Sequence, residues 1–284
     1  MSGARHLLRI SRPRFWLYLG GTYLVGFALG AGSLSELASP VFGVHLLYFL
    51  IPANVFLYGV NDLFDEDTDE LNPKKGREEH RLQASEKATT RWAVAISGLL
   101  GVMLAGLQAS GAGAMLMAAF LVLGTAYSVP PARLKARPYL DFLSNVLYAV
   151  PGLLGYVHAS GHLPPAIAVA AAAAWTGAMH LFSAIPDIEA DRSAGLSTTA
   201  VVLGQRRSLM VCTALWSAAA LGAVALAAGS GILVTALVAT AAAVYPVASA
   251  SLLRRPELVA GTYWRFPALN GLMGFALFVI AMLA

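Results

Sequence analysis

Long apolar stretches alternate with short polar stretches along the whole chain of 284 residues. A bilayer hydrocarbon core about 30 Å thick requires roughly 17–25 mainly apolar residues per helix. Scanning for such runs predicts nine membrane-spanning helices. They cover residues 15–32, 41–60, 92–109, 112–129, 139–158, 163–185, 208–228, 232–253 and 266–284. The runs are too long for strands and lack period-two alternation, so we expect an all-α membrane bundle.

Composition agrees with this pattern. Hydrophobic residues make up 58% of the chain and charged residues 12%, against roughly 45–50% apolar and about 25% charged in soluble domains. These values exclude an ordinary water-soluble fold. The single cysteine, Cys212, has no partner for an internal disulfide, and its apolar surroundings indicate an inert buried thiol. We expect one integral-membrane domain over residues 1–284, with cap loops at about 61–91 and 186–207.

The 19 basic residues test the span count independently, because cytoplasmic loops collect Lys and Arg. All of them fall in the N-terminus or in the connections after spans two, four, six and eight, which is one face of a nine-span arrangement. The net charge of +4 therefore indicates a multi-pass membrane protein and no nucleic-acid partner. We expect a cytoplasmic N-terminus and, in a prokaryote, a place in the plasma membrane.

The first cluster of acidic residues follows the second predicted span. If the helix continues past the membrane boundary, Asn61, Asp65 and Asp69 are spaced i, i+4 and i+8, and Asp62 joins the same face. Like charges at this spacing repel one another, so the arrangement costs stability unless a cation lies among them. Pro73 is expected to end this helix.

A second cluster follows the sixth predicted span. Asp187 and Asp191 are one helical turn apart, with Ser183 and His180 on the same stripe, and Pro186 is expected to kink the helix. Mg²⁺ prefers oxygen ligands and is commonly held by one or two carboxylates together with substrate phosphates. Two such clusters at corresponding helix ends therefore favour a Mg²⁺-diphosphate site that opens to the cytoplasm.

The acidic residues fit other kinds of site less well. Either cluster alone is typical of a solvated loop. A calcium-binding EF-hand would need Gly at its sixth position and Glu at its twelfth, where the chain has Glu70 and Gly76. Zinc would need Cys or His ligands nearby. A cation- or proton-coupled transporter is a rival function, as is a structural membrane subunit. The acids lie at span ends, however, and no inverted half-repeat is visible.

The two motifs, Asn61-Asp62-x-x-Asp65-x-x-x-Asp69 and Asp187-x-x-x-Asp191, resemble the aspartate-rich motifs of the UbiA superfamily of intramembrane prenyltransferases. Arg12-Pro13 before the first span and the segment from Tyr127 to Lys135 extend the resemblance over nearly the whole chain. Many relatives have Tyr-x-x-x-Lys after the fourth span, whereas Pro131 stands here at the lysine position, which leaves Arg133 and Lys135 as alternatives. The strings around Tyr58 and His180 are similar to those of lycopene elongases, which add a five-carbon unit to each end of a carotenoid.

The resemblance implies Mg²⁺-dependent transfer of an isoprenyl group from an allylic diphosphate to a hydrophobic acceptor in the membrane. The implied metal ligands are Asn61, Asp62, Asp65, Asp69, Asp187 and Asp191. The implied catalytic residues are Asp65, Asp187, Asp191 and His180, with His180 or Asp191 as the base that removes a proton after the new bond forms. The implied substrate-binding residues are Arg12, Lys74, Tyr127, Arg133, Lys135, Asn145 and Arg192.

Several alternatives stay open within this interpretation. Each basic residue is also suited to anchoring a helix end at the lipid headgroups. His180 and Asn145 are equally suited to bonding a neighbouring helix. The absence of basic residues within the spans favours a wholly hydrophobic acceptor or a lipid quinone precursor. The resemblance to lycopene elongases implies a carotenoid such as lycopene. Quinone, chlorophyll and ether-lipid precursors are the other acceptors.

Overall fold

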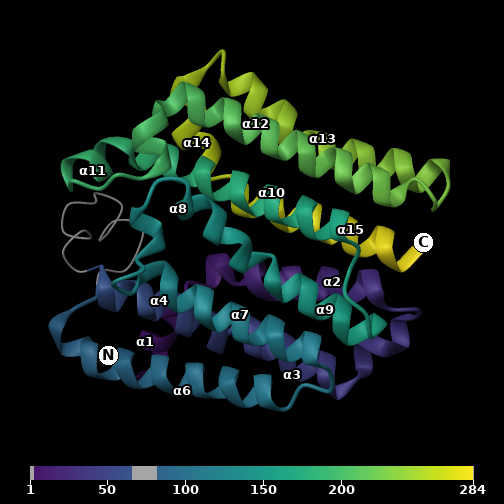
Figure 1. Ribbon diagram of the computed structural model, residues 1–284, viewed down its shortest axis with the longest axis horizontal. Coiled ribbons are helices and arrows are strands. Elements are labelled where there is room, and N and C mark those ends of the chain that lie inside the picture. The colour runs from purple at the N-terminus through teal and green to yellow at the C-terminus, as the bar shows by residue number, and fades with distance from the viewer. Residues whose placement is uncertain (1–2, 66–81, 284) are drawn as a thin grey trace. The chain divides into compact units, whose positions relative to one another are not determined.

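The computed structural model describes residues 3–65 and 82–283, and every regular element in these ranges is a helix (Figure 1). The helices form two compact units. Unit 1 comprises residues 1–134 and 150–162, and unit 2 comprises residues 135–149 and 163–284. The all-α class expected from the hydrophobic pattern is confirmed for the described residues. The prediction of one domain over the whole chain stays a prediction.

Unit 1 contains the first half of the chain and one later helix. Its α-helices are α1 (Gly3–Ile10), α2 (Thr22–Gly30), α3 (Pro40–Leu50), α4 (Pro52–Phe64), α6 (Lys87–Gly106), α7 (Gly111–Ser128) and α9 (Val150–Ser160). Shorter turns precede α2, α3 and α6, namely η1 (Pro13–Phe15), η2 (Leu17–Gly21), η3 (Leu34–Ala38) and η4 (Ala84–Glu86). Proline occupies the first position of both α3 and α4, where its missing N–H has no helical partner to lose.

Helices α2 and α9 pack through glycines. A Cβ atom added to Gly26 would overlap the backbone carbonyl oxygen of Gly152, and one added to Gly155 would overlap that of Tyr23. Any side chain at these positions would therefore push the two backbones apart. Close approach of this kind is the usual basis of helix association in lipid, because burial of apolar surface does not drive helices together there.

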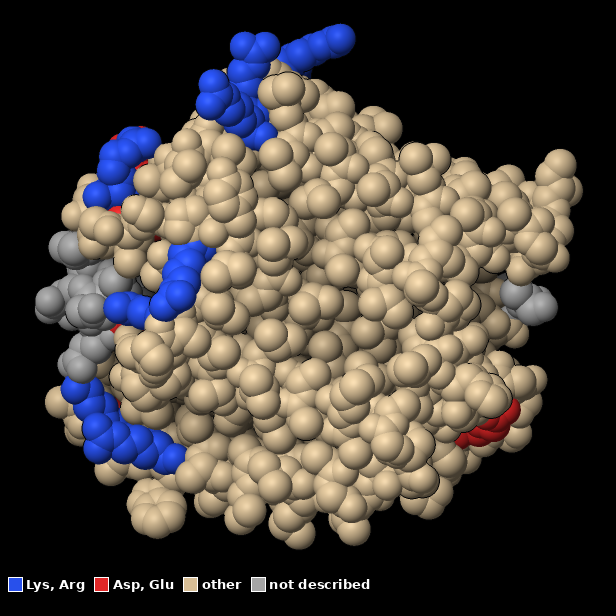
Figure 2. All heavy atoms as spheres, in the orientation of Figure 1, with Lys and Arg blue, Asp and Glu red and all other residues tan. Residues whose placement is uncertain are grey.

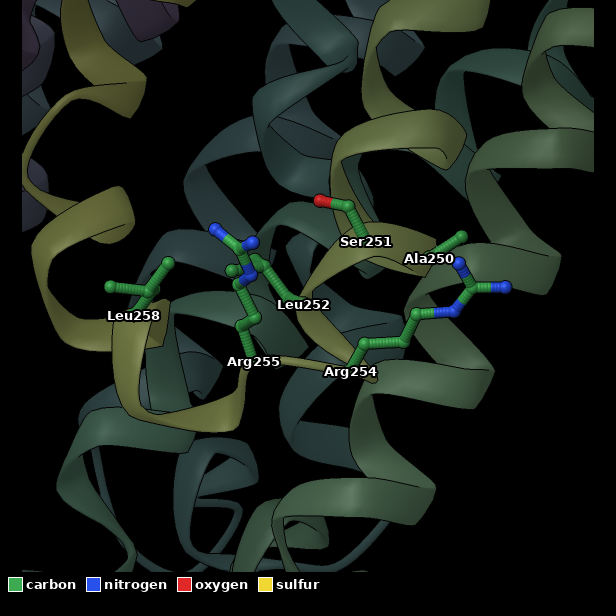
Figure 3. A pocket seen from close by; sticks show the side chains of 6 residues that line it. All are labelled: Ala250, Ser251, Leu252, Arg254, Arg255 and Leu258. Atoms are coloured by element: carbon green, nitrogen blue, oxygen red, sulfur yellow. The ribbon is translucent and has the colours of Figure 1, made fainter.

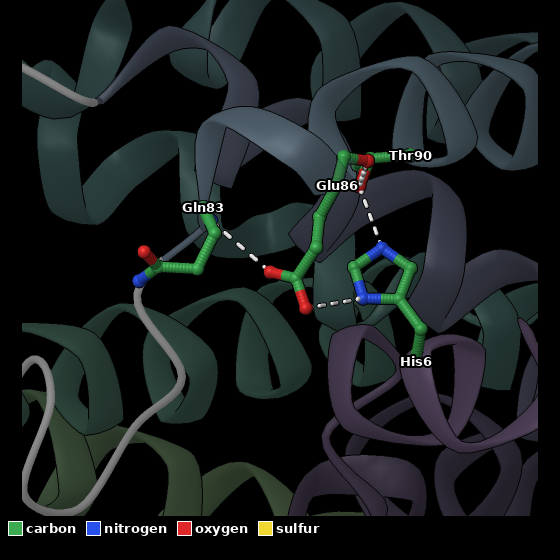
Figure 4. A network of polar contacts seen from close by, with 4 residues as sticks. All are labelled: His6, Gln83, Glu86 and Thr90. Atoms are coloured by element: carbon green, nitrogen blue, oxygen red, sulfur yellow. Dashed lines mark hydrogen bonds and ion pairs between the residues drawn. The ribbon is translucent and has the colours of Figure 1, made fainter. Parts of the chain in front are cut away.

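The short helix α1 is attached to the rest of unit 1 by a buried histidine, His6 (Figure 4). His6 Nε2 lies 3.0 Å from the hydroxyl oxygen of Thr90, and His6 Nδ1 lies 3.3 Å from a carboxylate oxygen of Glu86. Glu86 also accepts the backbone N–H of Gln83 in a capping box at the start of η4, the turn that leads into α6. The N-terminal helix is thereby fixed to α6, and the residues that follow it start from a defined point.

Unit 2 contains the rest of the chain. Its α-helices are α8 (Leu140–Leu143), α10 (Ala166–Ala184), α11 (Ile188–Ser193), α12 (Thr199–Ala227), α13 (Ile232–Leu252), α14 (Val259–Tyr263) and α15 (Phe266–Leu283). The remaining short turns of the chain are η5 (Leu134–Ala136), η6 (Ser144–Tyr148), η7 (Ile185–Asp187) and η8 (Pro256–Leu258). Four aromatic side chains, Phe182, Trp216, Tyr245 and Phe266, pack against one another in the core. Cys212 is buried in the same core, as expected.

Seven described helical segments are long and apolar enough to cross a membrane. They are Pro40–Phe64, Ala84–Gly106, Gly111–Ser128, Leu140–Ser160, Ala166–Ser193, Thr199–Ala227 and Ile232–Leu252. Pro256–Tyr263 and Phe266–Met282, bent by 66°, make an eighth if they are taken as one span. Much of the face seen in Figure 2 carries no charged side chain, which suits contact with lipid.

The predicted count of nine spans is not confirmed. The first predicted span, residues 15–32, consists of the turns η1 and η2 followed by the short helix α2. Helix α2 has only 9 residues, which is too short to cross a bilayer as one continuous helix. The seventh predicted span falls in α12, whose first turn is separated from the rest of the helix by a non-helical backbone at Gly204, with a φ of +73°. A cytoplasmic N-terminus stays a prediction.

Candidate active site

The first acidic motif lies at the end of α4 in unit 1. Asn61 and Asp62 are in the last turn of this helix, and Asp65 is the residue directly after it. The expected helix through Asp69 to Pro73 is therefore wrong in its first part, because α4 ends at Phe64. The negative end of the helix dipole disfavours further carboxylates in the same helix, which accounts for the early end. Asp69 and Lys74 lie outside the described residues.

Asp62 is paired with Arg12. It is 2% exposed, and Arg12 Nη2 lies 2.6 Å from its Oδ1. The guanidinium group of Arg12 also lies 4.6 Å from the centre of the Tyr58 ring, within the range of a cation–π contact. Arg12 has a φ of +46°, a strained value for a residue other than glycine. The pairing of α1 with α6 and the ion pair with Asp62 hold the chain in this conformation.

Asp65 and Asn61 lie beside the segment that follows α7. Asp65 is 4% exposed, and Arg133 Nη2 lies 3.8 Å from its Oδ1. The amide group of Asn61 donates to the hydroxyl oxygen of Ser128 at 3.3 Å, so its carbonyl oxygen remains suited to a metal ion. Tyr127 precedes Ser128 in the last turn of α7. Within unit 1, the structure therefore brings together Arg12, both described aspartates, Asn61 and Arg133.

The second acidic motif lies in unit 2 where α10 gives way to α11. Helix α10 ends at Ala184, and Pro186 lies within the 3-10 turn η7, so the predicted interruption at Pro186 is confirmed. Asp187 closes this turn and Asp191 lies in α11. The hydroxyl group of Thr198 donates to Asp191 Oδ2 at 3.1 Å. Both aspartates are half-buried, so part of each carboxylate is open to a ligand.

Four further predicted residues lie in unit 2. The amide group of Asn145 donates to the backbone carbonyl of Asp141 at 2.8 Å, so this contact stays within one segment of the chain. His180 is near the end of α10 and is influenced electrostatically by Asp141. Arg192 and Glu189 are both exposed, and Arg192 Nη1 lies 2.7 Å from Glu189 Oε1. Lys135, the alternative to Arg133, lies in η5.

The donor set suits a hard cation, although the described residues alone do not form a closed metal site. No group of three or more His, Cys, Asp or Glu side chains among residues 3–65 and 82–283 is close enough to hold an ion. Carboxylate and amide oxygens are nonetheless the ligands that Mg²⁺ prefers, and phosphate oxygens commonly complete its coordination. Asn61 and Asp65 in unit 1 therefore suit a cation that arrives with a diphosphate. Within unit 2, the same holds for Asp187 and Asp191.

A separate cavity of about 540 Å³ lies at the end of α13 in unit 2 (Figure 3). Its lining residues are Ala250, Ser251, Leu252, Arg254, Arg255 and Leu258. Two arginines and no acid line this space, so it is unsuited to a cation. None of the residues predicted for the site contributes to it.

Sequence reasoning missed the residues that support the acids. Ser128 and Thr198 are hydroxyl residues in an apolar and a loop segment, and nothing in their local pattern distinguishes them from others. Asp141 offered one usable signal, since it is an acid within a predicted span, where ionisable groups are costly and rare.

Known prenyltransferases are similar to this chain over most of its length. The UbiA prenyltransferase family matches residues 19–270. The lycopene elongase/hydratase of Haloferax volcanii is 45% identical over 95% of this chain and 86% of that protein. The lycopene elongase/hydratase of Halobacterium salinarum is 44% identical over 95% of this chain and 94% of that protein. The lycopene elongase/hydratase of Corynebacterium glutamicum is 32% identical over 78% of this chain and 77% of that protein.

Solved structures share the helical fold. A UbiA homolog from Archaeoglobus fulgidus bound to GPP and Mg²⁺ has a TM-score of 0.68 at 23% identity, over 96% of this chain and 99% of that one. A digeranylgeranylglyceryl phosphate synthase has a TM-score of 0.75 at 17% identity, over the full length of both chains.

Proposed function

Because this chain belongs to the UbiA prenyltransferase family, we propose that it transfers an isoprenyl group from an allylic diphosphate to a carotenoid within the bilayer. The chain is an integral membrane protein and a prenyltransferase. The carotenoid acceptor is supported by the names of its relatives, which are lycopene elongase/hydratases at up to 45% identity. The diphosphate donor and the metal are supported by the GPP and Mg²⁺ bound to a protein of the same fold. Lycopene and a five-carbon donor are the substrates that we propose.

The acidic residues would hold Mg²⁺ on the diphosphate. The proposed ligands are Asn61, Asp65 and Asp69 of the first motif, and Asp187 and Asp191 of the second. Since Asp62 is already paired with Arg12, its part is to orient that arginine. When bound, Mg²⁺ neutralises the developing charge of the departing diphosphate and so lowers the barrier to breaking the allylic C–O bond.

Two arginines of unit 1 are suited to the remaining phosphate oxygens. Arg12 and Arg133 lie beside Asp62 and Asp65 respectively, and each guanidinium group carries five N–H donors. Arginine binds phosphate oxygens in pairs, which fixes the orientation of the group as well as its position. We propose Lys74 and Lys135 as further cationic contacts.

Once the C–O bond breaks, the allylic cation must be kept from water until it meets the acceptor. Tyr58 is buried, and its ring lies near both the Phe15 ring and the guanidinium group of Arg12. Tyr127 lies in the last turn of α7, next to the serine that Asn61 contacts. Aromatic faces stabilise a cation that passes over them. We propose that these two rings line the path of the cation and that Asn145 helps to position the acceptor.

The last step removes a proton. A terminal double bond of the acceptor attacks the allylic carbon, a C–C bond forms, and the positive charge moves to the acceptor. Loss of a proton from the neighbouring carbon restores a double bond. We propose His180 as the base, since its imidazole group lies near the end of α10, with Asp191 as the alternative.

The proposal includes the membrane arrangement. We propose nine spans with the N-terminus in the cytoplasm and a site that opens to that side of the plasma membrane. The support is the distribution of the 19 basic residues, all of which fall on one face of that arrangement. Cysteine labelling in intact cells tests it, because Arg206→Cys should be reached only after the membrane is made permeable. Labelling of that cysteine from outside the intact cell would contradict the orientation.

The function is supported above all by the residues at the end of α4. Buried Asp65 lies beside Arg133, and Asp62 pairs with Arg12. Asn61 lies in the same turn of the helix as Asp62. The test is to incubate the purified enzyme with lycopene, dimethylallyl diphosphate and Mg²⁺. We expect a product heavier by one or two five-carbon units together with release of diphosphate. Product formation without Mg²⁺, or activity with a quinone precursor and none with lycopene, would contradict the proposed metal or acceptor.

A further inference from the structure

Asp141 is a buried carboxylate that belongs to neither acidic motif. It is the second residue of α8, and only 1% of its surface is exposed. Removing a carboxylate from water is unfavourable unless hydrogen bonds replace those made to the solvent. The contacts that Asp141 makes therefore indicate what it does.

Asp141 holds the first residue of α12. The backbone N–H of Thr199 donates to Asp141 Oδ2 at 2.6 Å, and the hydroxyl group of Thr199 donates to Asp141 Oδ1. The Thr199 hydroxyl oxygen in turn accepts the backbone N–H of Tyr139 at 2.5 Å. Tyr139 has a φ of +68°, which a residue other than glycine keeps only when its surroundings hold it. These three contacts fasten the start of α8 to the start of α12 (Figure 1).

The residue before Thr199 contacts the second acidic motif. Thr198 is the N-cap of α12, and its hydroxyl group donates to Asp191 Oδ2 at 3.1 Å while accepting the backbone N–H of Val201. The N–H that Asp141 accepts belongs to the peptide group joining Thr198 to Thr199. Asp141 therefore holds the peptide from which the Thr198 side chain projects toward Asp191.

We infer that Asp141 is a positioning residue for Asp191, acting through Thr199 and Thr198. By fixing this peptide, Asp141 sets the direction of the Thr198 hydroxyl, and that hydroxyl helps to set the orientation of the Asp191 carboxylate. The inference rests on the proposed function, in which Asp191 binds the Mg²⁺-diphosphate. Residues that orient a metal-binding carboxylate commonly contribute about 10- to 100-fold in affinity.

The test is Asp141→Asn in the full-length protein, purified in detergent. The amide cannot accept both Thr199 donors, so at least one contact to the charged carboxylate is lost or replaced by a weaker neutral one, without a change in size. Calorimetric titration with inorganic pyrophosphate and Mg²⁺ should show binding weaker by about 10- to 100-fold. Thr198→Val should give a similar loss, and the double variant should be little worse than either single variant, because both changes break the same connection. Thr199→Ser, which keeps both donors, should bind as the wild type does.

A control variant shows what a loss of stability does when the contacts between Asp141 and Thr199 are kept. Thr213→Val removes a 2.8 Å hydrogen bond between Thr213 and Ser249, which joins α12 to α13 elsewhere in unit 2. It should lower the melting temperature and leave pyrophosphate affinity unchanged. If Asp141→Asn does not fold, Thr199→Val carries the test. It removes the hydroxyl contact to Asp141 and keeps the backbone N–H contact, so we expect a smaller but measurable loss of affinity.

Unchanged affinity in Asp141→Asn or in its substitute Thr199→Val would overturn the inference, as would independent, multiplying losses in the double variant. A failure of the proposed function looks different. In that case the wild type itself would bind no Mg²⁺-pyrophosphate and release no diphosphate from an allylic donor.

Discussion

The two units hold their acidic motifs by different chemistry. In unit 1, the carboxylates lie against arginines, with Arg12 at 2.6 Å from Asp62 and Arg133 at 3.8 Å from Asp65. In unit 2, Asp191 accepts from the neutral hydroxyl group of Thr198, and its supporting network runs through Thr199 to Asp141. The described contacts of the first motif are thus with cationic side chains, whereas the described contact of Asp191 is with a neutral hydroxyl group.

This difference suggests a division of labour at the proposed site. A carboxylate paired with an arginine attracts a cation less strongly, but it fixes a guanidinium group that suits phosphate. A carboxylate held by a hydroxyl group keeps its charge for the metal. Substitutions in unit 1 should therefore affect diphosphate binding and stability, while those in unit 2 should affect the Mg²⁺ requirement.

The largest effect is expected from loss of one central carboxylate in each unit. Asp65→Ala and Asp187→Ala should each lower kcat/KM by about 10³-fold, because electrostatic stabilisation of the departing group is lost. Diphosphate release from membranes given an allylic diphosphate measures this. The conservative Asp65→Glu should retain more activity than Asp65→Ala. Normal turnover in both alanine variants would refute the site.

Arg12→Ala should have the next largest effect. It removes a proposed phosphate contact and leaves Asp62 buried without its ion pair, which costs about 3–5 kcal/mol of stability. We expect KM for the donor to rise by about 10- to 100-fold and the melting temperature to fall. Arg14→Ala, two residues along and exposed, is the matched control. Equal effects of the two substitutions would place Arg12 among ordinary membrane anchors.

Asp62→Asn and Asp191→Asn test most directly whether the acidic motifs of the two units have different roles. The first breaks a buried ion pair and should lower the melting temperature more than it changes the Mg²⁺ requirement. The second should raise the Mg²⁺ concentration for half-maximal activity by about 10-fold with little change in stability. Titration of activity with Mg²⁺, beside a thermal melt, separates the two. The reverse pattern would show that the roles of the units are exchanged.

The smallest effect is expected from Arg192→Ala. Arg192 and Glu189 are 54% and 82% exposed at their side chains, and exposed pairs contribute about 0–1 kcal/mol. Activity should stay within about twofold of the wild type. A large increase in KM for the diphosphate would instead assign Arg192 to the substrate.

The acidic motifs and the helical class could be predicted from the sequence because both depend on local patterns. Apolar runs and aspartates one turn apart are visible without tertiary structure. The pairing of Arg12 with Asp62 joins residues 50 positions apart, and the support of Asp191 by Thr198 depends on a loop, so neither follows from spacing. The helix end at Phe64 was mispredicted because periodicity continued into the acidic segment while the electrostatics of a helix C-terminus did not favour it.

The glycine contacts between α2 and α9 limit where a long, oily substrate enters the protein. Since Gly26 and Gly152 meet backbone to backbone, these helices cannot slide or part without losing the van der Waals contact that joins them in lipid. They act as one rigid wall. We therefore expect a carotenoid that enters from the lipid to pass between other helices, whose larger side chains can change rotamer as it passes.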